Sequence, residues 1–412
     1  MNDPVVGGSV LVLAGLLVIL MIRHAEVAFA VAIASFLIPL TLWNPGFDTR
    51  PVALFAAAMQ LPGLRNRVRG RQLKDHLNPW VLGAGVAITL AGTASIGWSL
   101  APSTTVTSVA AWAATLVIAI VFTSVLSRDQ IARVVGFVLV AVVAISALMF
   151  IVRFPGATAG GRARGMLSNA NGLGIFCAMS LPTLLTYRKS LRWLGCAGAL
   201  ALLVATNSRA GTLAAVVGLG VFAFRSAAGW VRFVIATATV CVLPFVSDLL
   251  DVMGSDAPTT GLLRTNDSRS QLWALTLDTF QAHPVTGIGL GALDIVGGNS
   301  YLKMLAELGF LGAALGIVLV AAYVSAVKAS TTVTAFLFTG LTSAVFESWL
   351  FAAGSLFCFL TFIMCVQDAV DEKTRDGHHL DRERPHSAVR RSSQPVGSGR
   401  RPGDPGALPR RH

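Results

Sequence analysis

Charged residues are scarce in this sequence. Asp, Glu, Lys and Arg make up 13% of its 412 residues, whereas a soluble globular protein carries about 25%. The hydrophobic set makes up 54%. These proportions exclude water as the main solvent of the folded chain.

Alternation of apolar and polar residues is missing as well. Runs such as Leu11 to Ile22 are continuously apolar, whereas a membrane β-barrel alternates in segments of about ten residues. A helix needs about 20 apolar residues to cross the hydrocarbon layer, and backbone groups in lipid must bond within their own segment. The sequence therefore predicts an all-α, polytopic integral membrane protein.

The apolar runs predict about thirteen transmembrane helices, or twelve if the short, proline-flanked third run is re-entrant. The segments are Val5–Ile22, Ala25–Trp43, Pro51–Gly63, Trp80–Trp98, Val106–Val125, Ile131–Val152, Asn171–Thr186, Leu191–Thr206, Ala210–Phe224, Val231–Ser247, Tyr301–Val324, Thr331–Phe346 and Trp349–Val366. No basic residue precedes the first run, so we expect a retained helix rather than a cleaved signal peptide.

Cysteines are few, and all five lie in apolar stretches without metal-ligand spacing to a histidine. They are interpreted as small buried hydrophobic residues, and neither a metal nor a cofactor is expected. The net charge of +12 is concentrated in short connections and in the tail. This distribution follows the positive-inside rule and favours membrane topology over nucleic-acid binding.

The basic connections define an orientation, because Lys and Arg stay on the cytoplasmic side. They contain Arg65 to Lys74, Arg128 with Arg133, and Arg188 to Arg192. Residues 1–367 are predicted to be the transmembrane domain, and 368–412 a disordered, basic, cytoplasmic tail. The tail is either solvated or bound to anionic headgroups. The N-terminus is outside with thirteen spans and inside with twelve.

The longest connection, 248–299, is placed outside by this alternation. Connections of this length are usually functional or disordered. Near 270–281 it has apolar residues at helical spacing, which predicts a short amphipathic helix on the outer membrane surface.

Five arginines fall on the external side, against the usual bias. They are Arg162, Arg164, Arg209, Arg264 and Arg269. A guanidinium keeps its charge and offers a planar fork of N–H donors that matches phosphate. Arg209 is the sharpest case, because an arginine between two apolar runs is costly without a polar cavity or a partner. The hypothesis is a phosphate ligand at the membrane. The alternatives are snorkelling, interfacial anchoring, pairing with a loop aspartate, or orientation of the following helix.

His283 precedes Pro284 and the turn sequence TGIGLG. Imidazole can act as a base near neutral pH, but His-Pro before glycines is also typical of a helix stop. Gly287, Gly289 and Gly291 follow no predicted strand, so a tight chain reversal is favoured over a phosphate-binding loop.

Several stretches together resemble the O-antigen ligase and polymerase family of membrane glycosyltransferases. They are RSQLWALTLDTFQAHPVTGIGLG, NSYLKMLAELGFLGAALG, NSRAG, GMLSNANGLG and TASIGWSLAPS. The resemblance covers roughly Thr93 to Gly316. It implies transfer of a glycan from a polyprenyl diphosphate carrier to a glycan or lipid acceptor on the outer side of the cytoplasmic membrane, without metal or nucleotide sugar.

By this resemblance, Arg209 and Arg269 match arginines that hold the diphosphate. Arg264 and Arg164 are added to that group from their predicted external position. Fixed cations would stabilise the charge that grows on the leaving group.

One position departs from the family pattern. Asn299, Leu302 and Gly309 fit the spacing of its last motif, but Gly298 stands where the family has a histidine that assists the acceptor. Asp294 and His283 are the nearby candidates to replace it. Otherwise, the protein is not an active ligase.

A membrane transporter, or a non-catalytic protein that binds a lipid-linked glycan, is the alternative. A transporter would usually show buried mid-membrane charges and repeated halves, and neither is evident. Lys303 and Glu307 are interpreted as a polar helix face. The expected partners are the lipid-linked donor, the acceptor and membrane lipids, with no nucleic acid.

The first prediction concerns the cell's lipids. If the protein consumes a carrier-linked glycan, then deleting it should cause that glycan to accumulate on its carrier. Mass spectrometry of extracted lipids would detect the accumulation and identify the donor. An unchanged pool of carrier-linked glycans would contradict the transferase hypothesis.

Overall fold

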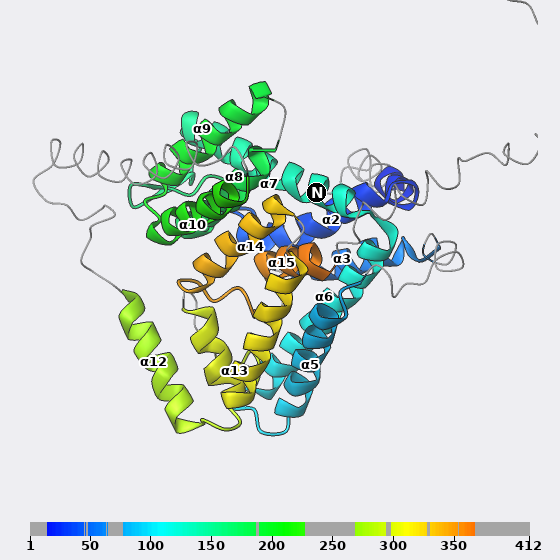
Figure 1. The fold of residues 1–412 in the computed structure, drawn as a ribbon, viewed down its shortest axis with the longest axis vertical. Coiled ribbons are helices and arrows are strands. Elements are labelled where there is room, and N and C mark those ends of the chain that lie inside the picture. The colour runs from blue at the N-terminus through cyan, green and yellow to red at the C-terminus, as the bar shows by residue number, and fades with distance from the viewer. Residues whose placement is uncertain are drawn as a thin grey trace, which may run out of the picture. The chain divides into compact units, whose positions relative to one another are not determined.

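The computed structural model describes most of the membrane-embedded chain (Figure 1). The described residues are 15–44, 46, 48–62, 64, 77–186, 189–226, 268–293, 298–327, 330–352 and 354–366, with the side chains of 189–191 and 268–270 excepted. The predicted span Val231–Ser247, most of the long connection before 268, and the tail 368–412 lie outside this set.

The described residues form twelve named α-helices, one 3₁₀ helix and one two-stranded hairpin. The helices are α2 (Ala25–Leu37), η1 (Ile38–Leu40), α3 (Arg50–Ala58), α5 (Pro79–Ser95), α6 (Pro102–Val125), α7 (Arg128–Ile151), α8 (Ala170–Leu184), α9 (Lys189–Ala205), α10 (Arg209–Arg225), α12 (Ser268–Ala282), α13 (Ser300–Ala326), α14 (Thr331–Ala344) and α15 (Leu356–Val366). The strands are β1 (Thr158–Ala159) and β2 (Arg162–Ala163), which pair antiparallel.

Among these helices, α6, α7 and α13 are long and apolar enough to cross a membrane, and several others are apolar but shorter. The prediction of an all-α, polytopic membrane protein is confirmed. Helix starts coincide with side-chain caps: Asn78, Ser127, Asn169, Ser208, Asn299 and Ser330 each accept a hydrogen bond from a backbone N–H of the first turn. Such caps satisfy donors that a helix end leaves unpaired.

The predicted span Trp349–Val366 is wrong in its first half. Residues 345–351 form turns and a bend, and α15 begins only at Leu356. The backbone N–H of Leu350 donates to the Ser300 hydroxyl at 3.0 Å, and Gly354 has a positive φ of 77°. This segment is therefore a chain reversal rather than the first turns of a helix.

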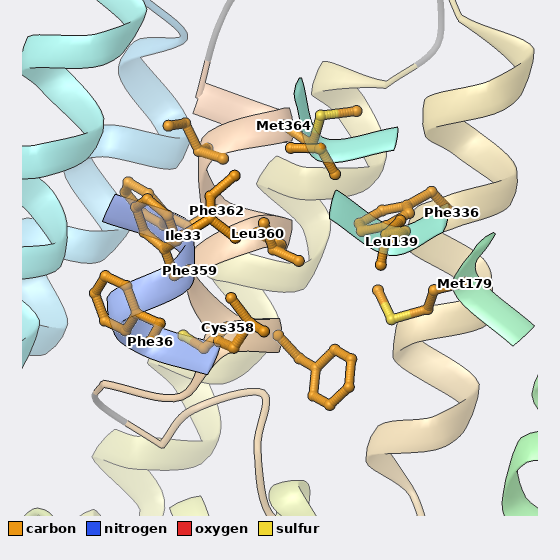
Figure 2. Packing of buried hydrophobic residues seen from close by; sticks show 14 of the residues in the cluster. Ile33, Phe36, Leu139, Met179, Phe336, Cys358, Phe359, Leu360, Phe362 and Met364 are labelled. Carbon is orange, nitrogen blue, oxygen red and sulfur yellow. The ribbon is translucent and has the colours of Figure 1, made fainter. Parts of the chain in front are cut away.

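The short helix α15 lies at the centre of the packing (Figure 2). Each of its residues is buried. Phe359 stacks on Phe36 of α2 with ring centroids 4.6 Å apart, and Phe362 meets Trp112 of α6 edge-on. Because α15 is enclosed by protein, it can be too short to cross the bilayer and still be stable.

The helix α13 is bent sharply at Gly309, where φ is 61° and ψ is −149°. Its first arm, 300–308, folds back beside the second, so that a Cβ on Gly312 would meet the carbonyl oxygen of Met304. The two arms are visible in Figure 1. The predicted segment Tyr301–Val324 is therefore helical, as expected, but it consists of two arms rather than one straight helix. The fold-back places Tyr301 beside α14 and Ser300 beside the turn that follows it.

The glycine turn 286–291 is a tight chain reversal, as expected. Gly287, Gly289 and Gly291 all have positive φ. The N–H of Gly289 donates to the carbonyl of Glu307 at 2.8 Å, and a Cβ on Gly289 would lie 2.6 Å from that of Ser99. The turn therefore packs tightly between α13 and the segment after α5. This packing explains the three glycines without a role in phosphate binding.

The segment after α5 is bonded to this reversal at three points. The Trp98 indole N–H donates to the Thr286 carbonyl at 3.0 Å, and the Leu290 N–H donates to the Ser95 hydroxyl at 3.1 Å. The Leu100 N–H donates to the Ile288 carbonyl at 2.9 Å. The tryptophan-serine stretch, the glycine turn and the first arm of α13 therefore form one packed unit.

Replacing Gly309 by alanine tests the fold-back. Its backbone conformation is essentially reserved for glycine, so Gly309→Ala should destabilise the fold by at least about 1–3 kcal/mol. A Cβ would also lie 2.6 Å from the Pro284 carbonyl oxygen. Thermal unfolding of the purified protein in detergent should show a lower Tm. The matched control is Gly83→Ala in α5, where a Cβ meets nothing within 4 Å, and its Tm should be unchanged or higher.

Candidate functional site

Arg162 lies on β2 and reaches into the turn between α9 and α10. Its Nε donates to the carbonyl of Thr206 at 2.8 Å, and its Nη2 lies 3.4 Å from the carbonyl of Asn207. Nη2 also donates to Oδ1 of Asn171 at 2.5 Å. One guanidinium therefore joins the hairpin, the α9–α10 turn and the start of α8.

The α9–α10 turn presents Arg209 at the first position of α10. Asn207 adopts a left-handed conformation with φ of 47°, and its buried Oδ1 has no hydrogen-bond partner among the described residues. Ser208 caps the helix by accepting from the N–H of Gly211 at 3.1 Å. Arg209 is half-buried. The turn that carries Arg209 is thus bonded to Arg162 through the carbonyls of Thr206 and Asn207.

Helices α8 and α10 approach each other closely beside this turn. A Cβ on Gly211 would lie 2.7 Å from the backbone carbon of Gly174, and one on Gly174 would lie 2.6 Å from the Cβ of Ser208. The two glycines allow the helices to pack backbone against backbone. This contact sets the N-terminus of α10 close to the first turns of α8.

Asn171, in the first turn of α8, extends the network to Glu347. Its Nδ2 donates to Oε1 of Glu347 at 3.1 Å, while its Oδ1 accepts from Arg162. Glu347 is half-buried and lies in the reversal between α14 and α15. Two consecutive hydrogen bonds therefore link the Glu347 carboxylate, the Asn171 amide and the Arg162 guanidinium.

Ser300 ties the start of α13 to the same reversal. Its hydroxyl donates to the carbonyl of Glu347 at 2.6 Å and accepts from the N–H of Leu350. Asn299 caps α13 by accepting from the N–H groups of Tyr301 and Leu302, at 2.8 and 3.1 Å. The asparagine of the last motif is thus a helix cap.

Three helix N-termini, those of α8, α10 and α13, are connected through these contacts. Each helix start carries a partial positive charge, equivalent to roughly half an elementary charge, which favours a nearby anion. Arg162 adds a full positive charge, against the carboxylate of Glu347, and Arg209 is the first residue of α10. The arrangement is suited to binding an anion with several oxygens.

Arg164 is used by its own loop. Its Nε donates to the carbonyl of Gly156, and its Nη1 lies 3.5 Å from the carbonyl of Ser168. These contacts hold the hairpin loop in shape. Binding of diphosphate by Arg164 stays a prediction, and Arg162, from the same loop, has the contacts to the α9–α10 turn.

Arg269 is the second residue of α12, one turn before Trp273. The ring of Trp273 lies 6.5 Å from that of Phe346, the neighbour of Glu347. The backbone of α12 therefore runs beside the reversal that contains Glu347. The side chain of Arg269, and all of Arg264 and Asp294, lie outside the described set, so their roles stay predictions.

His283 ends α12 and has an exposed side chain. Its N–H donates to the carbonyl of Phe280 at 3.0 Å, and its carbonyl accepts from the N–H of Gly287 at 2.9 Å. These backbone bonds are those of a helix stop, one of the two interpretations of the His-Pro pair. A catalytic role for His283 stays untested.

Lys303 and Glu307 do not form an exposed polar face. Glu307 is 2% exposed, and its Oε1 lies 3.5 Å from the Nζ of Lys303. The same Nζ donates to the carbonyl of Leu293 at 3.0 Å, and the N–H groups of Gly291 and Leu293 face the Glu307 carboxylate. The pair therefore holds the end of the glycine turn against α13.

Sequence reasoning missed Asn171, Asn207, Ser300 and Glu347. Only Glu347 had a signal of its own, because an acidic residue between two apolar runs is costly and usually functional. In the part of the chain that the structure describes, no three His, Cys, Asp or Glu side chains come together as a metal site requires.

Comparison with known families gives a match over part of the chain. Residues 194–297 match the model of the O-antigen ligase family, which confirms the resemblance. The matched segment contains Asn207, Arg209, Arg269 and His283, and ends just before Asn299. No curated protein matches the chain.

Replacing Ser300 by alanine tests how the site is held. The variant leaves the buried N–H of Leu350 without its acceptor, and an unsatisfied buried group costs about 1–3 kcal/mol. Ser300→Ala should lower the Tm in detergent and reduce donor binding. Ser180→Ala in α8 is the control, because Ser180 is also buried and its hydroxyl donates to the Cys177 carbonyl of its own turn. Equal Tm values for the two variants would contradict the bridging role.

Proposed function

We propose that this protein transfers a glycan from a polyprenyl diphosphate carrier to an acceptor hydroxyl. The match of residues 194–297 to the O-antigen ligase family model supports a glycosyltransferase-like function in glycan assembly at a membrane. The carrier and the chemistry are the proposal. The observation that carries it is the meeting of Arg162 and the Arg209 turn with three helix N-termini.

A diphosphate suits this meeting point for electrostatic reasons. Arg162 and Arg209 supply two permanent charges, and the starts of α8, α10 and α13 add partial positive charge. When the bond from the sugar to the diphosphate breaks, negative charge grows on the departing oxygens. Fixed donors therefore stabilise the transition state more than the bound donor.

The assignment of residues follows the contacts. Arg209 and Arg269 bind the diphosphate, as the family resemblance implies, and Arg162 joins them because it reaches the Asn207 turn. Arg162 is held by three acceptors, so it is already oriented before the donor binds. Preorganised groups of this kind contribute most to rate, because they need no rearrangement during the reaction.

An apolar groove beside the site supports a lipid carrier. The groove has a volume of about 610 Å³ and lies along the folded arms of α13. Its lining includes Tyr301, Met304, Gly312, Gly316, Val320 and Phe351. Tyr301 is adjacent to Ser300, so one end of the groove begins at the site. An isoprenoid chain is apolar and would be favoured in such a groove.

The proposed orientation places the site on the extracytoplasmic side of the cytoplasmic membrane, with the C-terminus in the cytoplasm. Arg128 and Arg133 then mark the cytoplasmic end of α7. The chain passes from α7 through the hairpin to α8, which brings Arg162 to the opposite side. The acceptor is a glycan or a lipid, and neither a metal nor a nucleotide sugar takes part.

Charge reversal tests the cationic site. Arg209→Glu and Arg269→Glu should each leave the protein in the membrane but lower transfer by about 10²-fold or more, which is the cost of removing one transition-state donor. The measurement is formation of the glycosidic bond from purified lipid-linked donor in proteoliposomes.

The matched control is Arg133→Glu. Arg133 is largely exposed and pairs with Glu26 at 3.6 Å, and exposed pairs contribute little, so its transfer should be unchanged. Undiminished transfer by the Arg209/Arg269 double variant would rule the proposal out. Movement of the glycan across the bilayer without a new glycosidic bond would favour a transporter instead.

A further inference from the structure

The reaction proposed above requires a proton acceptor, because the attacking hydroxyl of the acceptor must lose its proton. Position 298 is a buried glycine and cannot take that proton. We infer that the carboxylate of Glu347 is the general base, an inference that rests on the proposed function. Glu347 is brought to this position by the fold rather than by sequence spacing.

The backbone of Glu347 is fixed against the start of α13. The Ser300 hydroxyl donates to its carbonyl at 2.6 Å and accepts from the N–H of Leu350. Ser300 is two residues beyond Gly298 in the chain. The reversal between α14 and α15 therefore brings the backbone of an acidic residue against the start of α13, two residues after the position where the glycine leaves no base.

The side chain of Glu347 is oriented toward the cationic cluster. Its Oε1 accepts from Nδ2 of Asn171 at 3.1 Å, and Asn171 in turn accepts from Arg162. A carboxylate has about four lone-pair sites, so the bond from Asn171 orients the group and occupies one of them. The Asn171 amide thus orients both the proposed base, Glu347, and Arg162, which is proposed to stabilise the leaving group.

The other titratable candidates among the described residues are placed less well. His283 is exposed at the end of α12. Glu307 is buried against Lys303 and the glycine turn, where it holds the fold. Among the described acidic side chains, Glu347 is the one bonded into the network of Arg162.

The chemical step balances as follows. The acceptor O–H gives its proton to the Glu347 carboxylate while its oxygen forms a bond to the anomeric carbon of the donor glycan. The bond from that carbon to the diphosphate oxygen breaks, and its electron pair leaves with the polyprenyl diphosphate. Arg162, Arg209 and Arg269 hold the resulting charge. Glu347 later releases the proton to water.

The test is Glu347→Gln, measured for donor binding and for transfer. Glutamine keeps an oxygen that can accept from Asn171 but cannot act as a base. General base catalysis contributes typically about 10²–10⁴-fold, so transfer should fall by that factor while donor affinity stays within about twofold. Glu347→Asp, which keeps a carboxylate, should retain more transfer than Glu347→Gln. Glu26→Gln is the control, because Glu26 forms an exposed pair with Arg133.

A second variant distinguishes a base from a structural support. Gly298→His, introduced into Glu347→Gln, supplies an imidazole at the vacant motif position, and transfer should rise above that of Glu347→Gln alone. A glutamine variant that keeps full transfer would overturn the inference. So would one that loses donor binding in proportion to transfer, since Glu347 would then only position Arg162. In both cases loss of transfer in Arg209→Glu would leave the proposed function standing.

Discussion

Three hydrogen bonds from the Arg162 guanidinium hold the candidate site together. A guanidinium among apolar helices is costly unless its donors find acceptors. Here the acceptors come from the α9–α10 turn and from Asn171 of α8. Satisfying the charge therefore requires these segments to lie side by side. Asn171 also donates to the Glu347 carboxylate, and the backbone carbonyl of Glu347 accepts from Ser300 at the start of α13. The same network therefore also fixes the reversal against α13.

Much of the fold could be predicted because the bilayer imposes a simple rule. Apolar runs become helices, and Asn or Ser residues at their starts become caps, so the ends of α5, α7 and α10 lie within a few residues of their predicted positions. The bend in α13 could not be predicted in this way. Gly309 adopts its conformation because Phe310 bonds to the Pro284 carbonyl, and that partner is distant in sequence.

The candidate site was predictable only in part. Arg209 stood out, because an arginine between two apolar runs needs a reason. Asn171 and Ser300 did not, because each resembles an ordinary residue at a helix start. Their importance comes from partners 176 and 47 residues away, and no periodicity within one helix reports such pairings. The family match also ends before Ser300 and Glu347.

The contact between Gly174 and Gly211 sets the spacing of α8 and α10 at the proposed anion site. Both positions lack the carbon that would push the two backbones apart, so the starts of α8 and α10 lie close together. Adding one methyl group at either glycine would widen the gap between the two dipoles. Their field at a bound anion would weaken while every charged residue remained in the chain. Under the proposed function, the field at the anion thus depends on two missing methyl groups as well as on the arginines.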